Sequence, residues 1–108
     1  MIVEMRVYQC VPGRLPALQE RFARHTLAFF KKHGIEPMGF WTTLVGESSH
    51  ELMYLLKWQN MAEREAKWNA FQSDPEWIAR RTESEAEKPI LAGVKNQFLA
   101  PTAFFPAG

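Results

Sequence analysis

The sequence predicts an α+β fold: a ferredoxin-like four-stranded antiparallel sheet with helices on one face. Segments with period-two alternation and segments with helical periodicity follow one another in the order β-α-β-β-α-α-β. A short polar turn joins the second and third strands, which is typical of an antiparallel hairpin. The chain has no linker or low-complexity tract, so residues 1–108 are expected to form a single domain.

The first strand and the first helix are separated by a change of period. Residues 2–10 alternate between two faces, which predicts a strand. One face consists of Val3, Met5 and Val7, and the other of Glu4, Arg6 and Tyr8. Pro12 and Gly13 end this pattern. From Arg14 to His33 the apolar residues recur at 100° per residue, which predicts an amphipathic helix that stops at Gly34.

A hairpin and a second helix follow. Residues 36–46 are rich in aromatic and β-branched types, and residues 51–58, "ELMYLLKW", form the next strand. Asn60 is expected to cap the following helix, with Glu63 reaching back as in a capping box. This helix is expected to run to about Phe71.

The last helix is predicted from a second capping signal. Asp74 is placed as N-cap and Pro75 as the first helical residue. The helix is expected to reach about Glu87, before Pro89. Residues 90–99 predict a weaker fourth strand, and the apolar tail after it is irregular.

The third predicted strand is apolar on both faces, although the helices can cover only one. One face carries Met53, Leu55 and Lys57, and the other Leu52, Tyr54, Leu56 and Trp58. A solvated face does not need so much apolar surface. We therefore expect a homodimer in which two sheets close face to face into a dimeric α+β barrel.

Composition excludes several classes of function. The net charge is +1 with mixed signs, so no nucleic-acid partner is expected. No apolar run is long enough to span a membrane, and the N-terminus lacks the features of a signal peptide. Cys10 is the only cysteine, which fits a cytoplasmic location and a small, half-buried apolar role. No histidine pair has metal-ligand spacing, so neither a metal nor a cofactor is expected.

An aromatic corner lies between the last two helices. "WNAFQSDPEW" places Trp68, Phe71 and Trp77 around a tight polar break. Aromatic residues in this setting are more often core than a stacking platform. We expect them to be buried as a lid over the sheet.

Four segments in sequence order resemble the NIPSNAP domain family. They are "YQCVPGRLPALQERF" from Tyr8, "KKHGIEPMGFWTTLVG", "MAEREAKWNAFQSDPEWIA" and "NQFLAPTAFFP". The resemblance implies a dimeric α+β barrel and no settled activity. Family members often carry a His-x-Trp-x-Tyr row on the third strand, where this chain has Tyr54, Leu56 and Trp58. A polar role of that histidine is therefore not expected here.

A small apolar or aromatic ligand is expected between the first helix and the sheet. The candidate lining residues are His25, Tyr8, Tyr54, Phe22, Phe29 and Trp41. His25 flanks the apolar stripe of the helix, where it can act as a pocket base or simply bond to Tyr8, Glu4 or Tyr54. His33 is expected to cap the helix C-terminus, and His50 to be solvated.

Two functions stay open at this point. The first is a non-catalytic or ligand-binding NIPSNAP-type homodimer. The second is a cofactor-free monooxygenase or a haem-degrading enzyme, by analogy with relatives of the same fold. The sequence does not decide whether the protein is an enzyme, and it does not name a substrate.

Overall fold

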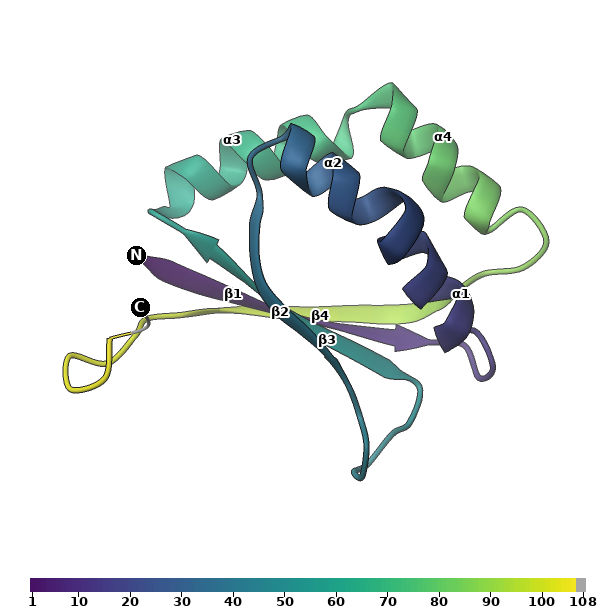
Figure 1. The fold of residues 1–108 in the computed structure, drawn as a ribbon, viewed down its shortest axis with the longest axis horizontal. Coiled ribbons are helices and arrows are strands. Elements are labelled where there is room, and N and C mark those ends of the chain that lie inside the picture. The colour runs from purple at the N-terminus through teal and green to yellow at the C-terminus, as the bar shows by residue number, and fades with distance from the viewer. Residues whose placement is uncertain (107–108) are drawn as a thin grey trace.

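The computed structural model describes residues 1–106, which form one antiparallel sheet with all helices on a single face (Figure 1). The strands are β1 (Ile2–Cys10), β2 (Glu36–Thr42), β3 (Glu51–Trp58) and β4 (Leu91–Leu99). They lie in the order β2-β3-β1-β4, so β1 and β3 are the central pair. This arrangement confirms the predicted ferredoxin-like α+β fold.

The first helix contains a π-helical turn. It consists of α1 (Leu15–Arg21), the π-helical turn (Phe22–Thr26) and α2 (Leu27–Lys32). The Leu27 N–H donates to the carbonyl of Phe22, five residues earlier. Thr26 Oγ1 donates to the Arg21 carbonyl at 3.3 Å. The turn therefore widens the helix in the middle, a feature often found at functional sites.

The two later helices begin at the predicted caps. They are α3 (Met61–Gln72) and α4 (Pro75–Ser84). Asn60 Oδ1 accepts from the Glu63 N–H at 2.9 Å, while the Glu63 carboxylate accepts from the backbone of Gln59 rather than from Asn60. Asp74 Oδ1 accepts from the Glu76 N–H at 2.9 Å. Both N-caps are thus confirmed.

Three predicted details are wrong. β2 ends at Thr42 and not at residue 46, because the chain bends in the polar turn that follows. α4 ends at Ser84 and not at Glu87. His33 does not cap carbonyl groups of its own helix; its Nε2 lies 2.7 Å from Asp74 Oδ2, because Asp74 at the start of α4 offers a carboxylate.

The aromatic corner is buried, as predicted. Trp68, Phe71 and Trp77 are 7%, 1% and 4% exposed. Phe71 stacks on Trp77 with ring centroids 4.9 Å apart, and it contacts Trp68 edge to face at 5.2 Å. The corner joins α3 and α4 above the sheet, where it seals the core.

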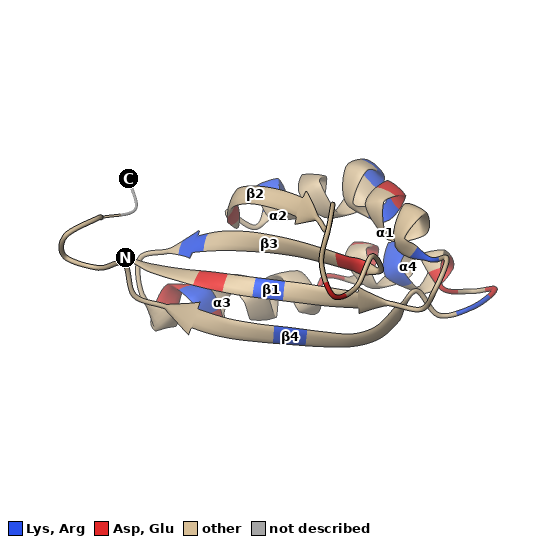
Figure 2. Cartoon of the chain, turned by 90° about the horizontal axis from the view of Figure 1, so that it is seen from below, with Lys and Arg blue, Asp and Glu red and all other residues tan. Residues whose placement is uncertain are grey.

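The opposite face of the sheet carries no helix (Figure 2). From the strand register, its central apolar residues are Met5, Val7, Trp41, Met53 and Leu55. A Cβ at Gly39 would lie 2.6 Å from the Trp41 ring, so glycine allows the indole to lie against the backbone. Along residues 1–106, no helix combines the length and the apolarity that a membrane crossing needs.

Candidate functional site

The polar face of β1 is the one that the helices cover. Glu4 is fully buried and accepts hydrogen bonds from four side chains. The donors are Arg6 at 2.9 Å, Trp58 at 3.1 Å, Arg64 at 3.1 and 3.2 Å, and Asn96 at 3.0 Å. Burial by itself would raise the pKa of Glu4, but the hydrogen bonds from Arg64, Asn96 and Arg6 outweigh it and lower the pKa. Glu4 is therefore a carboxylate at neutral pH.

Arg6 connects this carboxylate to a pair of tyrosines. Its Nε donates to Tyr54 Oη at 3.0 Å, and the Tyr54 and Tyr8 hydroxyl groups share a hydrogen bond of 2.8 Å. The guanidinium also lies 4.3 Å from the centroid of the Trp68 ring, a cation–π contact. Burial raises the pKa of Tyr54 well above its usual value. Tyr54 consequently stays protonated and is unsuited to act as a base near neutral pH.

A cleft of about 180 Å³ lies between the sheet and the helices, next to Arg6 and Tyr8. We call it the inner cleft. Its lining residues are Arg6, Tyr8, Arg21, Phe22, Thr26, Phe71, Gln72, Trp77, Arg81, Leu91 and Val94. Three of these are arginines and four are aromatic, and within residues 1–106 no carboxylate lines the cleft. The π-helical turn places Phe22 and Thr26 on this side of the first helix.

Two N–H groups at the inner cleft have no acceptor among the described residues. They are Arg21 Nε and Trp77 Nε1, and both are shielded from solvent. Arg21 is 5% exposed, and only its Nη1 is engaged, donating to Ser84 Oγ at 3.2 Å. Leaving a buried donor without an acceptor costs about 1–3 kcal/mol. These two groups therefore favour a ligand that brings an acceptor.

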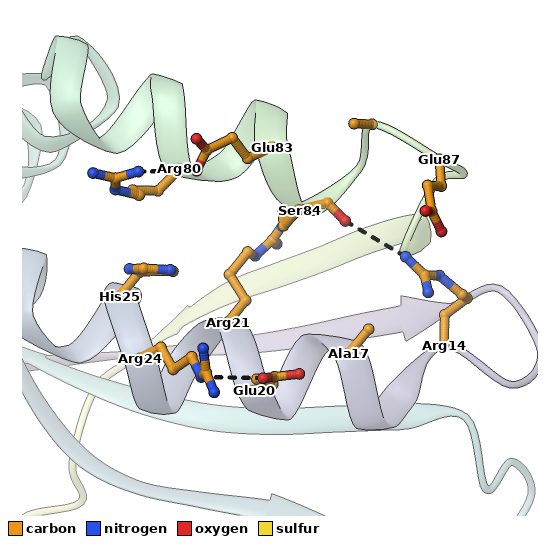
Figure 3. A pocket seen from close by; sticks show the side chains of 11 residues that line it. Arg14, Ala17, Glu20, Arg21, Arg24, His25, Arg80, Glu83, Ser84 and Glu87 are labelled. Atoms are coloured by element: carbon orange, nitrogen blue, oxygen red, sulfur yellow. Dashed lines mark hydrogen bonds and ion pairs between the residues drawn. The ribbon is translucent and has the colours of Figure 1, made fainter.

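A second hollow, the outer groove, separates the first helix from α4 on the side away from the sheet (Figure 3). Its volume is about 470 Å³. His25 lies on the first helix, facing Arg80 of α4 in this view. The rim holds two ion pairs, Arg24–Glu20 at 3.1 Å and Arg80–Glu83 at 2.9 Å. Arg21 lines both the outer groove and the inner cleft.

The structure separates the candidate residues that the sequence suggested. Tyr8 and Phe22 line the inner cleft, and Tyr54 lies behind Tyr8 in the core. Phe29 packs on the outside of Trp77, with ring centroids 5.7 Å apart.

His25 and Trp41 lie apart from that group. His25 lines the outer groove, where no hydrogen bond joins it to another described residue. Its expected partners, Tyr8 and Tyr54, bond to each other instead. Trp41 is half exposed on the uncovered face of the sheet.

Sequence reasoning missed the charged residues of the cleft. Arg6, Arg21 and Arg81 lie on three different elements, and only the fold brings them together. One signal in the sequence could have indicated them. Glu4, Arg6 and Tyr8 lie on one face of the first strand, and charged side chains on a buried face need polar or charged partners. Within residues 1–106, no group of three metal-ligating side chains is arranged to hold an ion.

The fold and the residues of the cleft define this chain as a ferredoxin-like α+β domain with a polar network beneath its helices. Residues 3–106 match the NIPSNAP family. The chain therefore belongs to the NIPSNAP family. A search of curated proteins finds no match to it.

Solved structures share the fold. An uncharacterised NIPSNAP domain protein from Burkholderia xenovorans has 24% identity and a TM-score of 0.85, covering 99% of this chain and 100% of that one. A putative antibiotic biosynthesis monooxygenase from Nitrosomonas europaea has 8% identity and a TM-score of 0.63, covering 93% and 97%. A mutant of MhuD with two manganese protoporphyrin IX molecules bound per active site has 17% identity and a TM-score of 0.65, covering 100% of both chains. At these identities the likeness concerns the fold alone.

Proposed function

We propose that this NIPSNAP protein is a homodimer that binds a small, flat ligand with an apolar or aromatic body in the inner cleft. The observation that carries the proposal is the composition of the cleft wall. Tyr8, Phe22, Phe71 and Trp77 supply aromatic surface, and two buried N–H groups there lack acceptors. Ligand pockets commonly combine such apolar walls with a few polar groups that fix orientation.

The size of the inner cleft limits the ligand. Its volume of about 180 Å³ is below the roughly 300–1,000 Å³ of pockets that hold drug-sized molecules. A ligand of about one aromatic ring is therefore favoured. A porphyrin macrocycle does not fit this cleft.

The binding proposal is tested by blocking the mouth of the cleft. Val94 lines it and is 45% exposed, so a larger side chain is tolerated there. Benzyl alcohol titrated into the wild type should shift the indole N–H signal of Trp77 in ¹H–¹⁵N spectra. Val94→Trp should abolish the shift, whereas Val94→Thr, which keeps the side-chain volume, should retain it. Equal shifts in both variants would place the ligand elsewhere.

The dimer rests on the uncovered face of the sheet. Met5, Val7, Met53 and Leu55 form a continuous apolar patch there, with Trp41 at its edge. A biological interface on this face should bury more than about 1,000 Å² in total. A monomeric mass by light scattering at micromolar concentration would contradict the dimer.

The second candidate function is an enzyme of the cofactor-free monooxygenase or haem-degrading type. The observation that favours it is His25 in an outer groove whose volume of about 470 Å³ suits a larger ligand. His25 would there be the base or the haem ligand, and Arg24 would meet a carboxylate group. A haem titration that shifts the Soret band in the wild type, and not in His25→Ala, would support this function. The same spectrum for both proteins would reject the haem-degrading type in which His25 binds the haem.

A further inference from the structure

The inner cleft has an excess of positive charge. This excess does not come from the Glu4 network, because Arg6 pairs with Glu4 and Arg64 pairs with both Glu4 and Glu65. Among the described residues, neither Arg21 nor Arg81 has a carboxylate within ion-pair distance. Burial lowers the pKa of Arg21, and the negative charge of Glu85, which forms no ion pair with Arg21, only partly opposes this shift.

We propose that the ligand of the inner cleft is a small aromatic carboxylate, whose oxygens accept from Arg21 Nε and Trp77 Nε1. This inference rests on the proposed function and adds the chemical class of the ligand. Both donors belong to side chains that are more than nine-tenths buried and line the cleft. A carboxylate offers two oxygens with lone pairs for two N–H groups, together with the negative charge that the cleft lacks.

The neighbouring contacts keep these donors available. Ser84 Oγ accepts from Arg21 Nη1, so the guanidinium is held in place while its Nε is not engaged. Gln72 Oε1 accepts from Arg81 Nη1 at 3.2 Å and fixes a second positive charge at the cleft. The amide of Gln72 is neutral, so this contact does not compensate the charge of Arg81. The anion would thus meet a preorganised site.

The aromatic walls specify the rest of the ligand. Tyr8 and Phe22 pack with ring centroids 5.8 Å apart, and Phe71 stacks on Trp77. All four side chains line the inner cleft. A single ring carrying a carboxylate satisfies both the walls and the volume, whereas inorganic phosphate satisfies only the charge.

The test compares benzoate with benzamide, its neutral counterpart of similar shape. Binding is followed by the Trp77 indole N–H signal, assigned as the one missing from Trp77→Phe. We expect benzoate to bind the wild type at least about tenfold more tightly than benzamide, the minimum change for a hydrogen bond to a charged group. Inorganic phosphate should bind more weakly than benzoate.

Three variants locate the carboxylate. Arg21→Gln and Arg81→Gln should each weaken benzoate at least about tenfold and leave benzamide unchanged. Arg80→Gln is the matched control. Arg80 lies on α4 next to Arg81, but it faces the outer groove and pairs with Glu83. It should not change either affinity. The comparison of benzoate with benzamide in the wild type decides the proposal even if Arg21→Gln does not fold.

The outcomes separate this inference from the proposed function. Equal affinity for benzoate, benzamide and benzyl alcohol would refute the inference that the ligand carries a carboxylate. It would still support the proposal that the inner cleft binds a small aromatic ligand. Tighter binding of phosphate than of benzoate would also overturn it. If none of these compounds shifts the Trp77 signal in the wild type, both the inference and the proposed function fail.

Discussion

Replacing Glu4 with glutamine should destabilise the protein by about 3–5 kcal/mol, because it removes one partner of a buried ion network. Glu4 is fully buried, and its carboxylate accepts five hydrogen bonds. Glutamine keeps the shape, but its NH₂ group would face N–H donors, and Arg6 and Arg64 would lose their counter-charge. The loss is at least about a fifth of the free energy of unfolding of a typical domain, about 5–15 kcal/mol.

Urea denaturation and thermal unfolding measure this loss. The midpoint temperature should fall by roughly 10–20 °C for a domain of this size. Wild type and variant are compared at one protein concentration, because the proposed dimer would make stability depend on concentration.

A matched control separates the buried charge from its partner. Glu65→Gln removes a carboxylate that also pairs with Arg64, at 2.9 Å, but that is 56% exposed. An exposed pair contributes about 0–1 kcal/mol, so this variant should be nearly as stable as the wild type. The free energies of unfolding of Glu4→Gln and Glu65→Gln are then compared. A difference below about 1 kcal/mol would mean that the cost of burying the charges cancels their attraction in the wild type, and this would refute our reasoning.

Three further predictions concern stability and assembly. Trp68→Ala should cost about 3–5 kcal/mol in urea denaturation, because the ring is buried; a loss below about 1 kcal/mol would show that the corner is not a structural lid. Hydrogen bonds from Lys32 and His33 lower the pKa of Asp74. The stabilisation they give is therefore complete above about pH 4 and is lost as the pH falls toward the folded-state pKa. Asp74→Asn should have a shallower loss of stability below pH 4, and a wild-type slope in this variant would contradict the assignment. Leu55→Glu should yield monomers in light scattering, and an unchanged dimer mass would place the interface elsewhere.

The sequence predicts the elements well where the local signals are strong. The first strand, the hairpin strand at 51–58 and both N-caps are confirmed. These depend on period-two alternation and on cap residues, which act over a few positions. The ends of α4 and β2 are set instead by turns with little compositional signature, and there the prediction runs three or four residues too far.

The inner cleft could not be derived from local pattern. The alternation of β1 separates Glu4, Arg6 and Tyr8 from the apolar residues, but it does not state which face the helices cover. An apolar face is ordinarily assigned to the core. Here the polar row is buried, and the apolar row lies on the face without helices. Burial of Glu4 depends on the positive charge of Arg64 and on a hydrogen bond from Asn96, and both residues lie far along the chain.

Two features that the sequence did not predict, the π-helical turn and the end of α4 at Ser84, position Arg21 at the inner cleft. The π-helical turn begins directly after Arg21, and Thr26 bonds to the Arg21 carbonyl across it. α4 ends at Ser84, whose hydroxyl donates to the Arg81 carbonyl at 2.6 Å and accepts from Arg21 Nη1. The carbonyl of Ser84 accepts from Arg14 at 3.5 Å. A helix that continued to Glu87 would engage that carbonyl internally and move the anchor of Arg21. The early stop of α4 thus holds Arg21 between the outer groove and the inner cleft, with its Nε not engaged by the protein.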